Sequence, residues 1–284
     1  MRALTAGLLL SAASLAPSAA QQADSLRRDT LRFRLQPVEI SVLRGTTAEL
    51  RTPAAVTAVA RATLQDAQLT VGLDEALAVV PGVVVNNRGT FAVGSRIAVR
   101  GLGVRAQFGV RGVRMLQDGI PLTMPDGQTN INNLDLGSAG RIEVLRGPAS
   151  SLYGNAAGGV IAIESEPAPH SGFAGELRTV ASDVGGDGLT RLTKHQIKVG
   201  GRADPLDYLL SAARFETSGF RAHSRAEQTS LNARVRLGQG PAARWTFLLN
   251  FVDAPVAQNP GSLPFDSADQ KPTMAWPANV NTRA

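Results

Sequence analysis

The second half of this chain alternates apolar with polar residues along several stretches, each roughly ten residues long. In one of them, Leu231, Ala233 and Val235 fall on one side of an extended chain, whereas Asn232 and Arg234 fall on the other. A period of two predicts β-strands, and this length with one apolar side is typical of strands that cross a membrane. A water-soluble β-sandwich stays open for these strands taken alone. The predicted strands are residues 175–182, 192–199, 208–215, 228–237 and 245–252.

The composition argues against several kinds of site. No apolar run approaches the roughly 18–20 residues that a membrane-spanning helix needs. The absence of cysteine removes zinc–thiolate sites, iron–sulfur clusters and thiol catalysis. The three histidines lack metal-site spacing, so we expect no enzyme activity, bound metal or cofactor. A serine–histidine–aspartate site, which depends on geometry alone, stays open. The net charge of +6 comes from scattered arginines, so we expect no nucleic-acid partner.

The first 20 residues have the pattern of an export signal. Arg2 provides the positive start, residues 3–10 are apolar, and residues 18–20 (SAA) form a small-residue cleavage site before Gln21. The apolar run is too short to span a bilayer. We therefore expect residues 1–20 to be removed on export and the polar residues 21–30 to be disordered.

Residues 51–168 are predicted to form a compact α+β unit. The pattern indicates a short helix at residues 70–80, ended by Pro81 and Gly82. Glycine, proline, asparagine or aspartate bounds the short apolar runs, which predicts strands in a small mixed sheet. The longest loops are residues 101–113 and 121–134, and loops on a rigid scaffold are where ligands usually bind. The predicted strands are residues 56–59, 83–85, 97–99, 114–117, 142–145 and 160–163.

Three motifs in this unit occur in a specific order and spacing. They are residues 97–101 (IAVRG), residues 115–121 (MLQDGIP), and residues 141–154 (RIEVLRGPASSLYG), the last followed by GGVI at 158–161. Together with residues 73–83, they closely resemble the plug domain of TonB-dependent outer-membrane receptors. The resemblance covers about residues 36–168, and the third motif is its most specific part.

The resemblance implies a fold and a location. We expect an α+β plug domain with a small mixed sheet and short helices, followed by antiparallel transmembrane β-barrel strands in the outer membrane. The expected parts are a signal peptide (1–20), a disordered N-terminus (21–50), the plug (51–168) and barrel strands (169–284). Plugged transporters have about 22 strands, whereas the residues after the plug can hold about four to six. We therefore expect the barrel to be incomplete in this sequence.

Two short alternating stretches, residues 31–35 and residues 38–42, lie before the plug. From the residues alone, each could be an edge strand of the next domain or a strand that adds to the sheet of a partner. The resemblance favours the partner, because the second stretch looks like a TonB box, which pairs with the inner-membrane protein TonB. The predicted box residues are Pro37, Val38, Glu39, Ile40, Ser41 and Val42.

The resemblance also implies roles for polar residues of the plug. We expect Arg100 and Arg146 to meet acidic residues on the inner barrel wall, with Glu143 in the same network. Local salt bridges inside the plug are the alternative. The outward loops are expected at residues 102–110 and 122–130, where arginine suits anionic iron chelates. The expected ligand contacts are Arg105, Gln107, Arg111, Gln128 and Asn130.

The predicted function is active, TonB-dependent uptake of a scarce ligand, a ferric siderophore or a similar iron complex. The alternative is an exported plug-like binding module without transport activity. The sequence does not identify the ligand or the oligomeric state. If the chain is expressed alone, the unpaired edges of its last strands predict aggregation.

Overall fold

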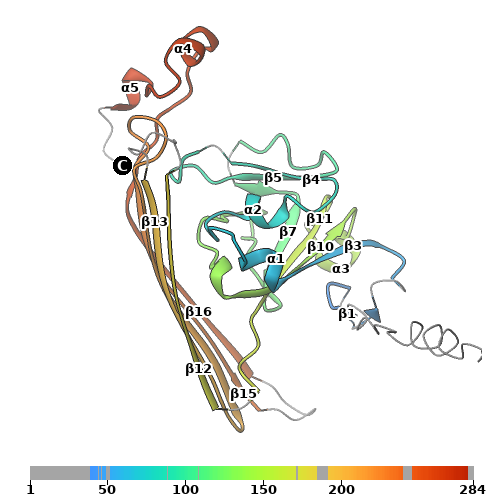
Figure 1. Ribbon diagram of the computed structural model, residues 1–284. Coiled ribbons are helices and arrows are strands. Elements are labelled where there is room, and N and C mark those ends of the chain that lie inside the picture. Colours follow the sequence, from blue (N-terminus) through green and yellow to red (C-terminus); the bar gives the residue numbers. More distant parts are fainter. Residues whose placement is uncertain are drawn as a thin grey trace, which may run out of the picture. The chain divides into compact units, whose positions relative to one another are not determined.

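The computed structural model describes residues 39–43, 45, 47–48, 52–87, 89–107, 109–170, 172–183, 191–238 and 245–280 (Figure 1). All of them belong to one compact unit, Val38–Ala284. The predicted export signal, the polar residues 21–30, the stretch 31–35, and Pro37 and Val38 lie outside the described residues.

The α+β domain is built on a five-stranded mixed sheet. The spatial order of its strands is β3 (Ala55–Ala60), β10 (Ala139–Arg146), β11 (Gly159–Ser165), β7 (Val113–Gln117) and β8 (Ile120–Pro121). Strands β11 and β7 are parallel, and the other pairs are antiparallel. The mixed sheet expected from the sequence is confirmed, with β3 and β8 as its edges.

The mixed sheet has an apolar core on each face. Ile142 and Val144 of β10 point into the larger core, together with α1 (Arg61–Gln65) and α2 (Leu73–Leu77). Leu145 points into a smaller core with Ile40 and Val42 from the start of the described chain. Alternate residues of one strand therefore hold both layers together, as a period of two requires.

Two predicted elements differ from the structure. The strands expected at 83–85 and 97–99 form a separate ribbon, β4 (Val83–Asn86) with β5 (Arg96–Val99), rather than joining the mixed sheet. The helix expected at 70–80 spans only Leu73–Leu77. Its shortness has a local cause, because the Glu75 carboxylate accepts hydrogen bonds from the backbone N–H groups of Thr70, Val71 and Gly72. These residues cap the helix instead of extending it.

The remaining elements are short. They are β1 (Glu39–Ile40), β2 (Thr47–Ala48), β6 (Val110–Arg111), β9 (Gln128–Thr129), η2 (Leu136–Ser138), α3 (Ser150–Tyr153), α4 (Phe265–Gln270) and α5 (Pro277–Val280). None of the described helices is long and apolar enough to cross a membrane.

The second sheet is antiparallel, and its strands follow one another in chain order. All predicted strands of this region are present and longer than expected. Residues 200–205 have the composition of a turn (GGRADP), but the turn is shorter, because Gly200 and Gly201 pair with Leu209 and Tyr208 and carry β13 onward to Ala203. Its strands are β12 (Gly172–Asp183), β13 (Arg191–Ala203), β14 (Leu206–Thr217), β15 (Ala226–Leu237) and β16 (Trp245–Ala257).

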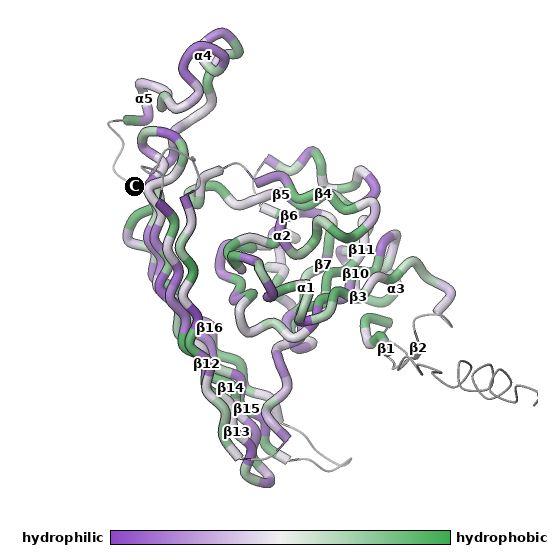
Figure 2. Tube along the Cα trace, viewed as in Figure 1, coloured by the Kyte–Doolittle hydropathy of each residue, from purple (hydrophilic) through white to green (hydrophobic). Residues whose placement is uncertain are grey.

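The two faces of the antiparallel sheet are reversed relative to those of a water-soluble sheet. Leu231 is 45% exposed and Leu249 is 61% exposed, whereas Lys198 is 6% exposed and Arg234 is 2% exposed. Figure 2 shows the resulting alternation of hydrophilic and hydrophobic residues along these strands. An apolar outer face with a polar inner face suits a hydrocarbon environment outside, and it argues against the water-soluble β-sandwich. Within the described residues the sheet is open, with β12 and β16 at its edges.

Replacing Ile142 by alanine tests the role of β10 in the larger core. Ile142 is fully buried among apolar side chains, and such truncations cost about 2–5 kcal/mol of unfolding free energy. Chemical denaturation of the chain purified in detergent measures this loss. The matched control is Val84→Ala, since Val84 is 63% exposed and should change stability by less than about 0.5 kcal/mol. Equal effects at the two positions would contradict the assigned core.

Candidate functional site

The first described residues are packed against the α+β domain. Strand β1 pairs with β2 through Glu39–Ala48 and Ile40–Thr47. Ile40 is fully buried, and Val42 is 2% exposed. Both side chains belong to the smaller core. The second half of the predicted box is therefore part of the domain in this structure.

The backbone of this segment is bound by side chains of the domain. The Glu143 carboxylate accepts hydrogen bonds from the N–H groups of Ser41 at 2.9 Å and Val42 at 2.8 Å. The Tyr153 hydroxyl donates to the Val42 carbonyl at 2.7 Å. The Ser41 hydroxyl donates to Glu164 at 2.7 Å. Groups that would have to pair with a partner strand are thus already occupied.

Glu143 has different neighbours from those that the resemblance implied. Its carboxylate is fully buried and lies 2.9 Å from the Arg141 guanidinium. Its described partners are Arg141, Ser41 and Val42, and none of them belongs to the antiparallel sheet. Contacts inside the domain, the alternative from the sequence, therefore describe Glu143. Neighbouring charge and hydrogen bonds of this kind keep a buried carboxylate from being left unpaired.

Arg100 and Arg146 converge on one place. Arg146 donates to the Pro81 carbonyl at 3.0 Å and to the Thr57 hydroxyl at 2.9 Å. A side-chain carbon added at Gly147 would lie 3.7 Å from a terminal nitrogen of Arg100. Within the described part of the chain, no carboxylate lies within ion-pair distance of either guanidinium. This pair of cations can accept an acidic partner.

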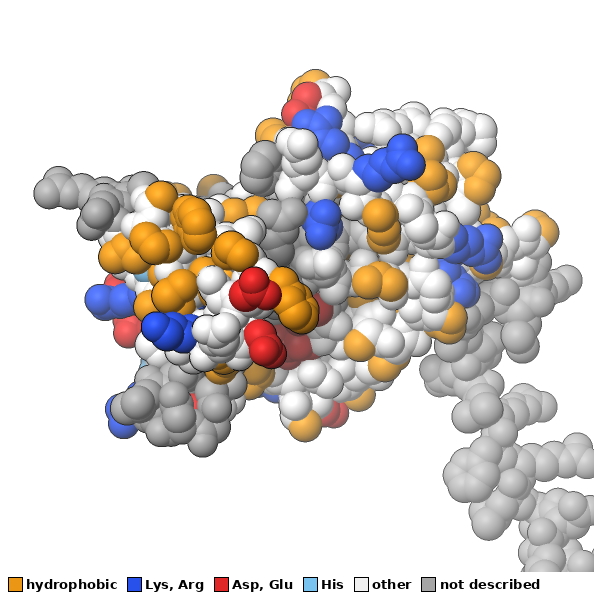
Figure 3. All heavy atoms as spheres, turned by 90° about the horizontal axis from the view of Figure 1, so that it is seen from above, with side chains coloured by type: hydrophobic (Ala, Val, Ile, Leu, Met, Phe, Trp, Pro, Cys, Tyr) orange, Lys and Arg blue, Asp and Glu red, His pale blue; other side chains and the backbone are white. Residues whose placement is uncertain are grey.

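The structure brings some of the expected ligand contacts together. Arg111 donates to the Gln128 amide oxygen at 3.0 Å across the β6–β9 ribbon. Arg105 and Arg111 line one groove of about 570 Å³ with residues 101–104, 106 and 112. Gly103 lets this loop fold back, because a side chain there would collide with the Ile97 carbonyl. The face seen in Figure 3 carries several Lys and Arg side chains.

Two other expected ligand contacts, Gln107 and Asn130, do not line this groove. The Asn130 side chain accepts a hydrogen bond from the Asn132 N–H at 3.0 Å and so shapes its own turn. Gln107 is exposed in the same loop as Arg105 but does not line its groove. Among the described residues there is no cluster of three or more histidine, aspartate or glutamate side chains that could hold a metal ion.

A loop that the sequence analysis did not single out ties the two sheets together. The rings of Phe91 and Phe215 lie 4.7 Å apart. Thr90 donates to the Gln258 carbonyl at 2.9 Å, and Asn132 donates to the Phe91 carbonyl at 3.0 Å. Thr90 and Phe91 therefore fix this loop to the ends of β14 and β16. A lone phenylalanine in a Gly- and Ser-rich loop was the available signal, since such a ring usually needs a partner.

Comparison with known families identifies the α+β domain. Residues 48–160 match the family profile described as "TonB-dependent Receptor Plug Domain".

This chain carries a TonB-dependent receptor plug domain.

Two curated relatives match part of the chain. The chain is 35% identical to a hemin receptor of Yersinia pestis over 144 residues, which is 46% of this chain and 19% of that protein. It is 32% identical to a hemin receptor of Yersinia enterocolitica over 144 residues, or 46% of this chain and 18% of that protein. The aligned part thus spans about a fifth of the length of these relatives.

Solved structures share the fold. The unliganded ferric citrate transporter FecA superposes with a TM-score of 0.63 at 23% identity, covering 79% of this chain and 34% of that one. The pyoverdine outer-membrane receptor FpvA from Pseudomonas aeruginosa gives 0.60 at 19% identity, covering 77% and 30%. The fold predicted from the motifs, a plug followed by antiparallel strands, is confirmed.

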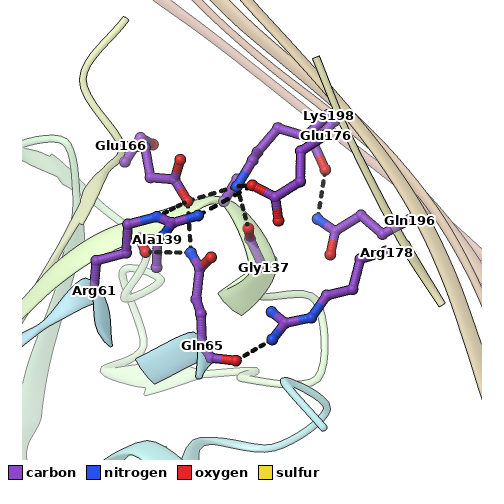
Figure 4. Close-up of polar contacts among 12 residues, drawn as sticks. Arg61, Gln65, Gly137, Ala139, Glu166, Glu176, Arg178, Gln196 and Lys198 are labelled. Atoms are coloured by element: carbon purple, nitrogen blue, oxygen red, sulfur yellow. Dashed lines mark hydrogen bonds and ion pairs between the residues drawn. The ribbon is translucent and has the colours of Figure 1, made fainter. Parts of the chain in front are cut away.

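Glu166 is the centre of the polar contacts between the plug and the antiparallel sheet (Figure 4). It lies 2.6 Å from the Lys198 ammonium of β13 and 3.0 Å from the Arg61 guanidinium of α1. Glu176 of β12 completes the group at 3.0 Å from Arg61 and 3.1 Å from Lys198. Gln65 donates to Glu166 at 2.6 Å. We call Arg61, Gln65, Glu166, Glu176 and Lys198 the anchor cluster.

The anchor cluster sets the charge state of Glu166. Burial alone would raise the pKa of its carboxyl, but the bonds from Lys198 and Gln65 outweigh burial and hold the pKa below its ordinary value of 4.5. Glu166 is therefore ionised at neutral pH. Burial would lower the pKa of Arg61, but the hydrogen bond and the negative charge of Glu166 raise it above its ordinary value.

Acid should weaken the hold of the plug on the sheet. Because the folded-state pKa of Glu166 is lowered, its stabilisation is complete above pH 4.5 and is lost as the pH falls through the folded-state value. Urea unfolding between neutral pH and about pH 3 measures this loss, and Glu166→Gln should flatten that part of the profile. The control is Glu216→Gln, which removes an exposed carboxylate paired with Arg214 inside the sheet. Parallel profiles for the unsubstituted chain and Glu166→Gln would refute the assignment.

Proposed function

We propose that this chain is the plug and first wall strands of an outer-membrane receptor that takes up an anionic iron complex by TonB-dependent transport. The observation that carries the proposal is the plug domain seated against the polar face of a sheet whose other face is apolar. Such a sheet places lipid on one side and the plug on the other. The relatives are receptors and transporters, so the alternative of a binding module without transport is not favoured. The signal peptide of residues 1–20 and the outer-membrane location belong to the same proposal.

The groove at Arg105 and Arg111 favours an anionic ligand. Guanidinium groups bind carboxylate and catecholate oxygens through paired donors, and these two arginines line one open groove. Ferric siderophores carry oxygen donors of this kind and fit the groove by charge. Gln128 at 3.0 Å and the carboxylate of Asp126 at 3.6 Å hold Arg111 in position.

Hemin is a second candidate because the curated relatives are named hemin receptors. Haem iron usually takes a histidine, cysteine, methionine or tyrosine ligand. The chain has no cysteine, and His170, His195 and His223 all follow the plug. Met124, which is 48% exposed, lies in the expected outward loop 122–130 and is a plug side chain of one of these types.

We assign TonB as the partner of residues 37–42. Strand addition needs free backbone N–H and C=O groups. In this structure Glu143 and Tyr153 occupy those of Ser41 and Val42. The partner must therefore meet the segment after these bonds are broken. We likewise assign Arg100 and Arg146 to contacts with acidic residues of the surrounding wall, because neither has a carboxylate partner in the described part of the chain.

Deleting residues 37–42 in the full-length receptor tests the coupling role. Uptake of a radiolabelled ferric siderophore by whole cells should be lost, because no strand remains for TonB, whereas equilibrium binding should be retained. The deletion also removes Ile40 and Val42 from the smaller core, so thermal unfolding is measured beside binding to show that the plug stays folded. A deletion of equal length at residues 22–27 serves as the control and should preserve both. Loss of binding together with uptake, or of neither, would count against the proposal.

Replacing Arg105 or Arg111 by alanine tests the ligand groove. A hydrogen bond to a charged group contributes about 1.5–3 kcal/mol, so each change should weaken ferric siderophore binding roughly 10- to 150-fold. Titration monitored by intrinsic fluorescence measures the affinity. Arg236→Ala is the matched control, because Arg236 does not line this groove and lies 3.6 Å from Asp118. It is near the opposite end of β15 from Gln228, which donates to the Asn132 carbonyl. Unchanged affinity in both groove variants would exclude this face.

A further inference from the structure

The N-terminal part of the plug has few strong contacts up to Ala60 and strong contacts with the antiparallel sheet from Arg61 onward. The segment between the described N-terminus and Ala60 comprises β1, β2 and β3. Strand β3 lies at the edge of the mixed sheet and pairs only with β10 among the described strands. Of its side chains, only Val56 and Val59 are buried. Because β3 is an edge strand, its pairs can be lost one after another from Ala55 without disturbing β10–β11.

From Arg61 onward the chain is bonded to the antiparallel sheet and to Glu166. Arg61 contacts Glu166 and Glu176, each at 3.0 Å. Gln65, which is 1% exposed, donates to the Ala139 carbonyl at 2.8 Å and to Glu166 at 2.6 Å. The Gln65 carbonyl also accepts a hydrogen bond from Arg178 of β12. Figure 4 shows these side chains meeting between α1 and the first strands of the sheet.

The anchor cluster holds more strongly than the ion pairs of Arg61 alone, because Lys198 and Gln65 are buried. Arg61 is nearly half exposed, and by itself such a pair contributes little. Lys198, however, is 6% exposed and donates to Glu166 and to the Gly137 carbonyl. Removing one partner from a buried, hydrogen-bonded charge group is costly, because the other charge is left unpaired. The anchor cluster therefore resists separation as a unit.

We propose that the anchor cluster is a mechanical stop: a pull on the N-terminal segment detaches β3 up to Ala60 and is arrested at Arg61 and Gln65. The proposal rests on the proposed function, because the natural pull would come from TonB at residues 37–42. It adds the point at which that pull ends. The part of the plug that follows, including α1 and the loops after β5, would stay on the sheet while β10 loses one neighbour.

Force spectroscopy on the purified chain in detergent tests this. The chain has no cysteine, so handles can be attached through Gly45→Cys and Phe265→Cys. Gly45 has no atom within 4 Å of an added side-chain carbon, and Phe265 is 85% exposed. A pull from residue 45 leaves the bonds to Glu143 out of the force path. The first extension should release residues 46–60, roughly 50 Å of chain, and then stop.

Loss of the anchor should lengthen that first extension. In Arg61→Ala/Gln65→Ala/Arg178→Ala, which also removes the donor to the Gln65 carbonyl, the next tie to the sheet is Thr70, whose carbonyl accepts a hydrogen bond from Lys194 of β13 at 2.7 Å. The first extension should therefore grow by residues 61–69, roughly 30 Å. Lys198→Met removes the partner of Glu166 on the antiparallel sheet and should lower the force at which the first extension resumes. Arg214→Ala is the matched control, because its ion pairs with Glu216 and Glu227 lie within the sheet.

Two results would overturn the proposal. One is a first extension that already runs past Gln65 in the chain with an intact anchor cluster. The other is an unchanged first extension in Arg61→Ala/Gln65→Ala/Arg178→Ala, with the later unfolding steps of the mixed sheet showing that the variant is folded. Because no TonB is present, this measurement is independent of the deletion of residues 37–42. A failure of coupling and a failure of the stop are therefore distinguished.

Discussion

The polar inner face of the antiparallel sheet is the constraint on which the rest of the structure depends. Lys194, Lys198 and Arg234 are buried on this face, and a buried cation is costly unless polar groups surround it. The plug provides those groups largely through backbone carbonyls, from Thr70, Gly137 and Ser165. A carbonyl keeps its position through loops and short helices rather than through a side-chain rotamer. The short, irregular connections of the plug are therefore what make it complementary to the sheet.

The elements with a strong local pattern were predictable from the sequence. The alternation around Leu231 and Asn232 identified the strands and the face of each side chain, because that pattern reflects only the two environments on either side of a sheet. The motif through Glu143 and Gly154 identified the plug for a different reason, namely its specific order of residues. The helix at 70–80 was overestimated, because periodicity does not report that Glu75 would bind the N–H groups before it.

Contacts between distant segments were not predictable in this way. Nothing in the sequence near Glu143 indicates that its carboxylate binds residues about a hundred positions earlier, and the same holds for Phe91 and Phe215. The expected ligand contacts Arg111 and Gln128 do meet, because the β6–β9 ribbon joins their loops. Asn130 instead closes its own turn. Loop composition indicates that a region binds, but the direction of each side chain depends on pairings that only the folded chain shows.

Strand β10 connects these features. Its odd-numbered residues Glu143 and Leu145 face residues 40–42, whereas its even-numbered residues Ile142 and Val144 face the larger core, which includes Val110 of the β6–β9 ribbon. A close-packed sheet transmits a displacement rather than absorbing it, since its interior has little free volume. Residues 40–42 and the larger core are thus separated by the thickness of one strand. A plug built this way needs a part that can come away and a part that cannot. Edge strand β3 suits the first role, and the buried charges around Lys198 suit the second.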